Sequence, residues 1–325
     1  MTVCGSRENE LENAKTYMES KKMRHFITLE ELNTEEIQEI LRLAVELKEQ
    51  VKSGRRDPIF ERKILGFVFE KPSLRTRVSF EGLMKQHAGT SVYLGEEAGF
   101  GKREPLKDFV PVLSSYVDLL VMRTKSHELV TKASELSQCP VINGLTDYNH
   151  PCQALADILT VQELFGELAG KKIAYIGDSN NVTRSLALIC CRLGVTISIA
   201  SPTGYQFDDA QYQQWNANGE YAFSTTSPEE AVEGAVAVYT DVWTSMGQEA
   251  EREKRLNDLG DFQVSADLMA RAAEGAKFLH CLPARRGEEV SEEVADGPSS
   301  AIVHQAENRL HAQKGMVTWL LNQAN

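Results

Sequence analysis

A short run of arginines and hydroxyls, Ser73 to Arg77, contains the residue types that bind phosphate. It follows the apolar stretch Ile64 to Phe69 and opens a segment of helical character, so a strand is expected to lead into a helix here. The free N–H groups of a helix N-terminus attract anions, and Ser73, Arg75 and Thr76 add guanidinium and hydroxyl donors. The run therefore predicts a phosphate cradle, with a solvated basic turn as the alternative interpretation of this segment taken alone.

A second pair, His150 and Gln153, stands three residues apart at the start of another helical stretch, so the two side chains share one face. Both can hydrogen-bond a carbonyl or amide group of a ligand. A lone histidine at a helix start is usually a capping or core residue, which is the alternative interpretation. Because His150 lies at the junction between the two halves of the chain, we expect both side chains to face a ligand between domains.

The loop Gly177 to Asn181 follows the apolar stretch Lys172 to Ile176, at the carboxyl edge where open α/β sheets bind ligands. Its resemblance to a dinucleotide-binding loop is incomplete, since Ser179 and Val182 stand where further glycines are needed. This mismatch argues against a nicotinamide enzyme. Asn181 instead offers an amide to a small polar substrate.

Two later loops also follow predicted strands at this edge. Asp241 and Ser245 come just after the stretch Val236 to Tyr239, and a carboxylate with a hydroxyl suits an ammonium group. Cys281 follows the stretch Lys277 to His280 and is expected to face the same crevice. Buried cysteines are usually inert packing residues, so Cys281 considered alone leaves its role open.

The elements that must position these groups are short apolar stretches separated by helix-length segments, the pattern of a parallel α/β sheet. The stretches of the first half are Ile64 to Phe69, Leu119 to Met122 and Val141 to Ile142. Those of the second half are Lys172 to Ile176, Thr196 to Ala200, Val236 to Tyr239 and Lys277 to His280. We therefore expect an α/β fold of two doubly wound parallel-sheet domains with a cleft between them.

Three helices are expected to frame the sheets. Asn33 followed by Glu36 is a helix-start signal, and apolar residues then recur at helical spacing as far as Val51. Pro151 suits the first turn of a helix that joins the two halves, and a last helix over 306–321 is expected to dock on the body. The expected division is a tail at 1–22, domains at 23–150 and 151–304, and a C-terminal helical segment at 305–325.

Size and composition narrow the possible partners. A chain of 325 residues exceeds one ordinary domain, and its net charge of −12 argues against nucleic acid, whose phosphates need a basic surface. No apolar run approaches the roughly 20 residues of a membrane helix, and Met1 to Lys22 lacks the features of a secretion signal or transit peptide. The six cysteines show neither disulfide nor zinc-site spacing, so we expect reduced thiols, no metal and a cytoplasmic location.

Four motifs together resemble those of the aspartate/ornithine carbamoyltransferase family, and in particular of its ornithine-specific members. They are Ser-x-Arg-Thr-Arg at 73–77, His-Pro-Cys-Gln at 150–153, Asp-x-x-x-Ser-Met-Gly at 241–247 and His-Cys-Leu-Pro at 280–283. They occur in the family's order, and the resemblance spans about Met23 to Leu321. It implies an enzyme of arginine metabolism that transfers the carbamoyl group of carbamoyl phosphate to the δ-amine of L-ornithine, giving L-citrulline and phosphate.

The resemblance also implies roles for individual residues. Those implied to bind carbamoyl phosphate are Ser73, Leu74, Arg75, Thr76, Arg123, His150, Gln153, Leu282 and Arg309. Those implied to bind ornithine are Asn181, Asp241, Ser245, Met246, Cys281 and Leu282. Those implied to act in catalysis are Arg123, His150, Gln153, Cys281 and Arg309. No metal or organic cofactor is implied, because the carbamoyl group arrives already activated as an acyl phosphate.

Domain roles and assembly are implied in the same way. The first domain would hold carbamoyl phosphate, the second would hold ornithine, and the last helix would cross back to the first domain. Members of the family form trimers or multiples of trimers, and in relatives a neighbouring subunit contributes a residue to the site. The stretch Gly99 to Pro105 gives no clear match to that residue, for which His87 and Lys102 are the candidates.

Two departures leave the acceptor open between free and acylated ornithine. Leu74 stands where the common ornithine enzymes have Thr, and Ala284-Arg285-Arg286 is similar to the branch that carbamoylates N-acetyl- or N-succinyl-ornithine. Asp241 favours free ornithine, since acylation would leave this carboxylate facing an uncharged amide. It also disfavours aspartate, whose second carboxylate it would repel. A non-catalytic regulator that binds phosphate compounds or an amino acid is the alternative from another class.

Overall fold

The computed structural model describes residues 23–95, 100, 103–244 and 249–324. The first half of the chain forms a four-stranded parallel sheet in the order β2-β1-β3-β4. Its strands are β1 (Ile64–Phe69), β2 (Thr90–Leu94), β3 (Leu119–Arg123) and β4 (Val141–Leu145). Its helices are α3 (Leu74–Gln86), α4 (Leu106–Ser114) and α5 (His127–Leu136). Parallel pairing places the carboxyl ends of these strands at one edge, from which the loops to α3 and to α5 emerge.

The second half forms a five-stranded parallel sheet in the order β7-β6-β5-β8-β9. Its strands are β5 (Lys172–Ile176), β6 (Thr196–Ala200), β7 (Ala222–Thr225), β8 (Ala237–Thr240) and β9 (Lys277–His280). Its helices are α7 (Asn181–Arg192), α8 (Asp209–Trp215), α9 (Pro228–Val232), α10 (Arg252–Leu259), α11 (Ala266–Met269) and α12 (Glu292–Ala295). The chain order reverses at β5, which is the switch point where open sheets of this kind bind ligands.

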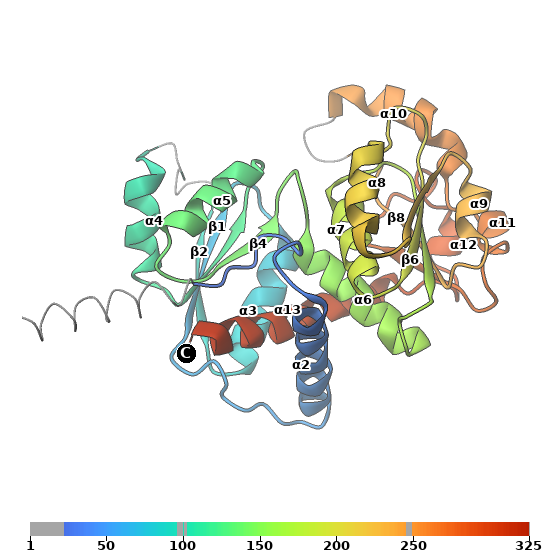
Figure 1. The fold of residues 1–325 in the computed structure, drawn as a ribbon. Helices are drawn as coiled ribbons and strands as arrows, with labels where there is room; N and C mark the ends of the chain where they lie inside the picture. The colour runs from blue at the N-terminus through green and yellow to red at the C-terminus, as the bar shows by residue number, and fades with distance from the viewer. Residues whose placement is uncertain (1–22, 96–99, 101–102, 245–248, 325) are drawn as a thin grey trace, which may run out of the picture.

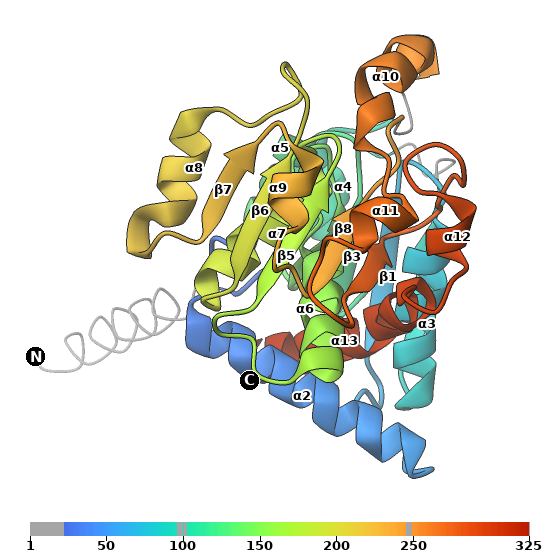
Figure 2. The same cartoon turned by 90° about the vertical axis from the view of Figure 1, so that its right-hand side faces the viewer.

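Three long helices connect and brace the halves: α2 (Thr34–Lys52), α6 (Pro151–Phe165) and α13 (Ile302–Ala324). In Figure 1 the two sheets lie to the left and right, and α6 and α13 run between them. Figure 2 shows the same helices beneath the sheets in a view turned by 90°. Because α13 packs against α2, α6 and α3, the last helix returns to the first half, as expected.

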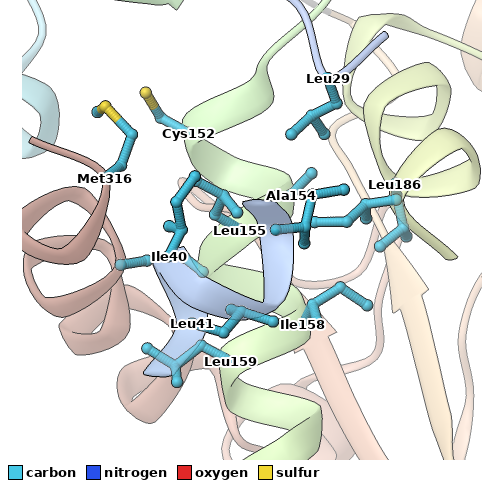
Figure 3. Packing of buried hydrophobic residues seen from close by; sticks show 14 of the residues in the cluster. Leu29, Ile40, Leu41, Cys152, Ala154, Leu155, Ile158, Leu159, Leu186 and Met316 are labelled. Atoms are coloured by element: carbon cyan, nitrogen blue, oxygen red, sulfur yellow. The ribbon is translucent and has the colours of Figure 1, made fainter. Parts of the chain in front are cut away.

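An apolar layer fills the space between these helices (Figure 3). Ile40 and Leu41 of α2 lie beside Leu155 and Leu159 of α6, and Met316 of α13 approaches from the other side. All of these side chains are buried in one continuous core that also includes strand residues of both sheets. The burial of this layer is the main favourable contribution to holding the two halves together.

The predicted architecture is confirmed, including both doubly wound sheets and the returning helix. The start of α2 follows the predicted signal, because Asn33 accepts a hydrogen bond from the Glu36 N–H and the Glu36 carboxylate accepts one from the Asn33 N–H. Two strands, β2 and β7, were not predicted; both are edge strands with partly exposed side chains. Among the described residues, none of the helices is both long and apolar enough to cross a membrane.

Candidate active site

A cavity of about 1090 Å³ opens between the two halves, at the carboxyl edges of both sheets. Residues from both halves and from α13 line it, so groups that are far apart in the sequence meet in one space. The predicted site residues that line the cavity are Ser73, Leu74, Arg75, Thr76, Arg123, His150, Gln153, Asn181, Asp241, Cys281, Leu282 and Arg309. Ser245 and Met246 lie outside the described residues.

The phosphate cradle forms where β1 leads into α3. Ser73 is the N-cap residue of α3, and its side chain accepts a hydrogen bond from the Thr76 N–H at 3.4 Å. The buried Thr76 Oγ1 is approached by three donors: Ser73 Oγ at 3.0 Å, Arg309 Nη2 at 3.0 Å and Arg123 Nη1 at 3.5 Å. A hydroxyl oxygen has only two lone pairs, so these donors outnumber the acceptor sites available to them. The cradle therefore offers hydrogen-bond donors in excess, which is what a bound anion requires.

Three guanidiniums, those of Arg75, Arg123 and Arg309, converge on this end of the cavity. Burial, together with the charges of Arg309 and Arg75, lowers the pKa of Arg123 to about 10. Burial also lowers the pKa of Arg309, whose side chain is 3% exposed. Among the described residues, none of the three forms an ion pair with a carboxylate. The remaining positive charge makes this end of the cavity a binding site for an anion.

Arg75 also bridges the two halves. Its Nη2 donates a hydrogen bond of 2.6 Å to the Leu282 carbonyl, in the loop after β9. Leu282 lies in a turn, where it has a positive φ of 62° and a cis peptide bond to Pro283. The contact joins the anion-binding end of the cavity to the loop that carries Cys281.

His150 is the residue before α6, but its side chain does not cap the helix. Its backbone N–H donates to Ser185 Oγ at 2.8 Å, while its imidazole Nε2 lies 3.4 Å from Arg309 Nη1. Burial, then the charges of Arg309 and Arg123, hold the pKa of His150 well below its ordinary value, so the ring is neutral. Because a guanidinium can only donate, Nε2 must accept, and the ring proton belongs on Nδ1. That Nδ1 is buried and has no hydrogen-bond partner among the described residues.

The opposite end of the cavity is built around a carboxylate. Asp241, after β8, accepts hydrogen bonds from Asn180 Nδ2 at 3.0 Å, from the Val242 N–H at 2.8 Å and from Cys281 Sγ at 3.0 Å. Burial and the Asp241 charge raise the pKa of Cys281 well above its ordinary value, so this side chain is a thiol. Asn181 donates to the Thr146 carbonyl at 2.6 Å and thereby links the second half to the first.

Two residues that the sequence interpretation missed complete this end. Asn180 caps α7, since its side-chain oxygen accepts from Val182 N and Thr183 N while its Nδ2 holds Asp241. Arg255 of α10 is buried, and it donates to the Asp178 carboxylate and to the Trp243 carbonyl. An N-cap signal could have identified Asn180. Arg255 lies in a run of charged residues, a pattern typical of a solvated surface.

Among the residues that the structure describes, one group of side chains could hold a metal ion: the potential ligand atoms of Asp241, His280 and Cys281 lie within 4.8 Å of one another. Each is already engaged in hydrogen bonds, Asp241 with Cys281, and His280 with the Leu282 N–H and the Glu289 carboxylate. A metal would have to displace these bonds. The sequence predicts no metal, and the hydrogen bonds give these side chains another use.

Of the two candidates for a residue shared between subunits, His87 is unsuitable. It is fully buried, and its Nδ1 lies 2.7 Å from the Asp57 carbonyl of the same chain. Such a side chain cannot reach the cavity of a neighbouring subunit without unfolding its surroundings. The other candidate, Lys102, lies outside the described residues.

Comparison with known proteins gives two matches to family models. Residues 24–163 match the aspartate/ornithine carbamoyltransferase carbamoyl-P binding domain, and residues 169–320 match the Asp/Orn binding domain of the same family. An ornithine carbamoyltransferase of Halalkalibacterium halodurans is 48% identical over 307 residues, covering 93% of this chain and 96% of that protein. One from Bacillus subtilis is 47% identical over 300 residues, covering 91% and 93%.

Solved structures give the same result. The ornithine carbamoyltransferase of Pyrococcus furiosus superimposes with a TM-score of 0.87 at 42% identity, covering 90% of this chain and 96% of that one. The enzyme of that name from Thermus thermophilus superimposes with a TM-score of 0.82 at 40% identity, covering 91% and 98%. The likeness therefore extends over both sheets and the helices between them.

Proposed function

This chain belongs to the aspartate/ornithine carbamoyltransferase family, and from that premise we propose how its cavity works. It is an enzyme that transfers the carbamoyl group of carbamoyl phosphate to the δ-amine of L-ornithine, giving L-citrulline and phosphate. The observation that carries this function is the charge arrangement of the cavity. Guanidiniums that have no carboxylate partner within the described part of the chain gather at one end, and a carboxylate with a protonated thiol lies at the other.

Carbamoyl phosphate binds at the cationic end. The phosphate is held by the Ser73 and Thr76 hydroxyls, by the backbone at Leu74, and by the guanidiniums of Arg75 and Arg123. An incoming phosphate supplies further acceptors to the donors around Thr76. Its negative charge also favours the protonated form of the crowded arginines. Arg123 is placed to reach the carbamoyl oxygen as well, since it extends from the end of β3.

The carbamoyl group is held by His150, Gln153 and Arg309. The amine nitrogen attacks the carbamoyl carbon, and the carbonyl oxygen becomes an oxyanion. The C=O bond then re-forms as the bond from that carbon to the phosphate oxygen breaks, and the proton lost by the attacking nitrogen passes to the departing phosphate. Negative charge therefore grows first on the carbamoyl oxygen and then on the leaving phosphate. Arg309 and Arg123 stabilise both charges, and the neutral His150 contributes its Nδ1–H as a hydrogen-bond donor.

Ornithine binds at the acidic end. Asp241 receives the α-ammonium with Ser245, and the α-carboxylate is held by Asn181 and the Met246 backbone. The Cys281 thiol and the Leu282 carbonyl position the δ-amine, which must be neutral to attack. Since the Leu282 carbonyl already accepts from Arg75, the same turn links the two substrate sites.

Free ornithine, and not an acylated form, is the acceptor. Asp241 lines the cavity, and an acyl-ornithine would leave this carboxylate without a cation to pair with. Of the sequence features that resemble the acyl-ornithine branch, Leu74 and Arg285 line the cavity, so the choice of free ornithine rests on Asp241. Leu74 is 76% exposed, and Arg286 pairs with Asp296 at 2.6 Å and does not line the cavity.

A single assay tests the function. The carbamoylated product and phosphate are measured with carbamoyl phosphate and each of four acceptors: ornithine, N-acetylornithine, N-succinylornithine and aspartate. We expect turnover with ornithine and a kcat/KM at least 100-fold lower for each of the others. Calorimetry that shows carbamoyl phosphate binding, with no product from any acceptor, would instead support a regulatory binding protein.

The roles of the domains and the assembly are proposed on the same basis. We assign carbamoyl phosphate binding to residues 23–150, ornithine binding to 151–304 and the returning helix to 305–325, with a tail at 1–22. We also propose a cytoplasmic enzyme of arginine biosynthesis that forms a homotrimer or a multiple of trimers. Val78 of α3 and Val92 of the edge strand β2 are exposed apolar side chains, which suits a contact between subunits. Light scattering should give a mass of three or more chains of 36.2 kDa.

A further inference from the structure

We propose that Asp157, which does not line the cavity, is a positioning residue whose carboxylate fixes the direction of two buried amides, Gln153 and Gln305. Through Gln153 it sets the place of Arg309 beside the carbamoyl group, so this inference rests on the proposed function. Asp157 lies on α6, one turn after Gln153, and its side chain is fully buried.

The hydrogen bonds form one chain that crosses three elements. Asp157 Oδ1 accepts from Gln153 Nε2 at 2.8 Å and from Gln305 Nε2 at 2.6 Å. At its other end, Gln153 Oε1 accepts from Arg309 Nη1. Gln305 Oε1 accepts from the His280 N–H at 2.7 Å, at the end of β9. The chain thus runs from the cationic end of the cavity, through α6 and α13, to the strand that precedes Cys281.

The donors at the two ends of this chain and the acceptor at its centre require the same direction for every bond. A guanidinium and a backbone N–H can only donate, so Gln153 and Gln305 must each present an oxygen to them. Their NH₂ groups are then left to face residue 157, which has to accept two hydrogen bonds on one oxygen. A residue without an acceptor at this position would leave both buried NH₂ groups without a partner, and Gln153 would be held beside Arg309 only by the bond to Arg309 itself.

Ionisation of Asp157 is unfavourable at this buried position. Burial raises the pKa of Asp157 to about 7, while the hydrogen bonds from Gln305 and Gln153 act in the opposite direction. The Tyr239 hydroxyl acts in the same direction as these amides. The two bonds that Oδ1 accepts do not depend on ionisation, so the proposed role needs the acceptor oxygen and not the charge.

The first experiment compares D157A and D157N. Asn keeps an oxygen that accepts from both glutamines, so D157N should retain kcat/KM for carbamoyl phosphate within about fivefold of wild type. D157A removes the acceptor and should lose 30-fold or more, with a weaker Kd for carbamoyl phosphate by calorimetry and an unchanged KM for ornithine. Both values are expressed per mole of folded protein.

T160V is the matched control. Thr160 is buried on the same helix, and its Oγ1 accepts from Asn308 Nδ2 of α13 at 3.0 Å, a link between the same two helices that does not reach the cavity. We expect T160V to lower the melting temperature and to leave the carbamoyl phosphate Kd within twofold of wild type. A role that is only structural would make D157A behave like T160V, and that result would overturn the proposal.

The second experiment reverses the direction of one bond. Q305E still accepts from the His280 N–H, but it places a second carboxylate against Asp157 and should lose about 100-fold in kcat/KM or fail to fold. In Q305E/D157N the new amide at position 157 donates to the new carboxylate at position 305 and accepts from Gln153, and the net charge equals that of wild type. The double variant should recover at least tenfold over Q305E, or recover folding.

These outcomes separate the two proposals. If D157A keeps kcat/KM within threefold of wild type, or if Q305E/D157N is no better than Q305E, Asp157 is not a positioning residue. If wild type makes no product from ornithine, the proposed function is what fails. The carbamoyl phosphate Kd of the same variants still tests the hydrogen-bond chain in that case.

Discussion

The two ends of the cavity carry opposite charges, and they differ in how far hydrogen bonds within the protein satisfy their polar groups. The cationic end holds Arg75, Arg123 and Arg309 with more donors than acceptors, and burial and mutual repulsion lower the pKa of Arg123 to about 10. The acidic end holds Asp241, which is already satisfied by hydrogen bonds from Asn180, the Val242 N–H and the Cys281 thiol. One end has hydrogen-bond donors in excess, whereas donors and acceptors are balanced at the other.

This difference indicates how each substrate binds. An anion that enters the cationic end supplies acceptors to donors that crowd one hydroxyl, in exchange for bonds such as those of Arg75 to Leu282 and of Ser73 to Thr76. An ammonium group that enters the acidic end must share Asp241 with partners that it already has. We therefore expect carbamoyl phosphate to bind first and ornithine to require a rearrangement around Asp241.

The largest expected effect comes from removing a guanidinium from the cationic end. Arg123→Ala should lower kcat by roughly 100- to 1000-fold, since a preorganised donor to developing charge contributes about 3 kcal/mol in the transition state. Arg75→Ala should behave alike, and steady-state citrulline formation measures both. Arg77→Ala is the control, because Arg77 is exposed and pairs with Glu81 and the Tyr93 ring. The kcat of Arg77→Ala should stay within tenfold of wild type. Equal losses at positions 77 and 123 would show that the number of positive charges, and not the place of the guanidinium in the cradle, determines activity.

The matching change at the acidic end is Asp241→Asn. It keeps the hydrogen-bonding shape but removes the charge that pairs with the α-ammonium, so kcat/KM for ornithine should fall by roughly 30- to 100-fold. The Kd for carbamoyl phosphate, measured by calorimetry, should not change. If carbamoyl phosphate affinity falls as much as ornithine affinity, the two ends are not independent and the comparison drawn above is wrong.

A smaller effect is expected when His150 is replaced. Comparing two replacements tests whether Nδ1 is the hydrogen-bond donor of the ring. An Asn amide nitrogen occupies a position near that of Nδ1, whereas a Gln amide reaches toward that of Nε2. We expect His150→Asn to retain about tenfold more activity than His150→Gln in kcat at saturating substrates. Because the pKa of His150 lies well below its ordinary value, the wild-type rate should also show no ionisation of this ring near neutral pH. The reverse order of the two variants would assign the proton to Nε2.

The sequence predicted the interior of the fold better than its margins. Strands such as β1 and β5 are continuous apolar runs because both faces are covered, and these were found. The edge strands β2 and β7 have partly exposed side chains and no such run, so their pattern resembles that of a loop. Register and pairing order come from tertiary packing, which short apolar runs do not encode individually.

The site was predictable where one short motif carries the chemistry, as at residues 73–77 and 150–153. It was not predictable where a residue acts through a neighbour. Asp157 lies in a helix that is buried from Pro151 to Val161, so no polar face marks it as unusual. Arg255 stands in a run of charged residues, so the sequence does not distinguish it from a surface residue. Only the fold brings it to Asp178. The role of a residue that acts through a neighbour depends on distances between elements, which sequence spacing does not give.

The smallest expected effect on activity concerns the carboxylate behind the cationic end, because D157N should stay within about fivefold of wild type. The effect of this change is therefore read from stability. Burial raises the pKa of Asp157 from 3.8 to about 7. The folded protein therefore binds this proton more tightly than the unfolded chain, and the stabilisation that protonation gives is lost as pH rises from about 4 to about 7. The ionisable groups that act on Asp157 are Arg309 of α13, Tyr239 of β8, Cys281 after β9 and Cys190 of α7.

D157N removes this titration and leaves those four groups in place. Relative to wild type, its free energy of unfolding in urea should rise by roughly 2 to 3 kcal/mol between pH 5 and pH 8. T160V, which keeps Asp157, should show the same pH dependence as wild type. A difference between D157N and wild type that stays constant over this range would mean that Asp157 is already ionised at pH 5. The charge behind Gln153 and Arg309 would then be permanent, and the cationic end would be better compensated than its pKa shifts indicate.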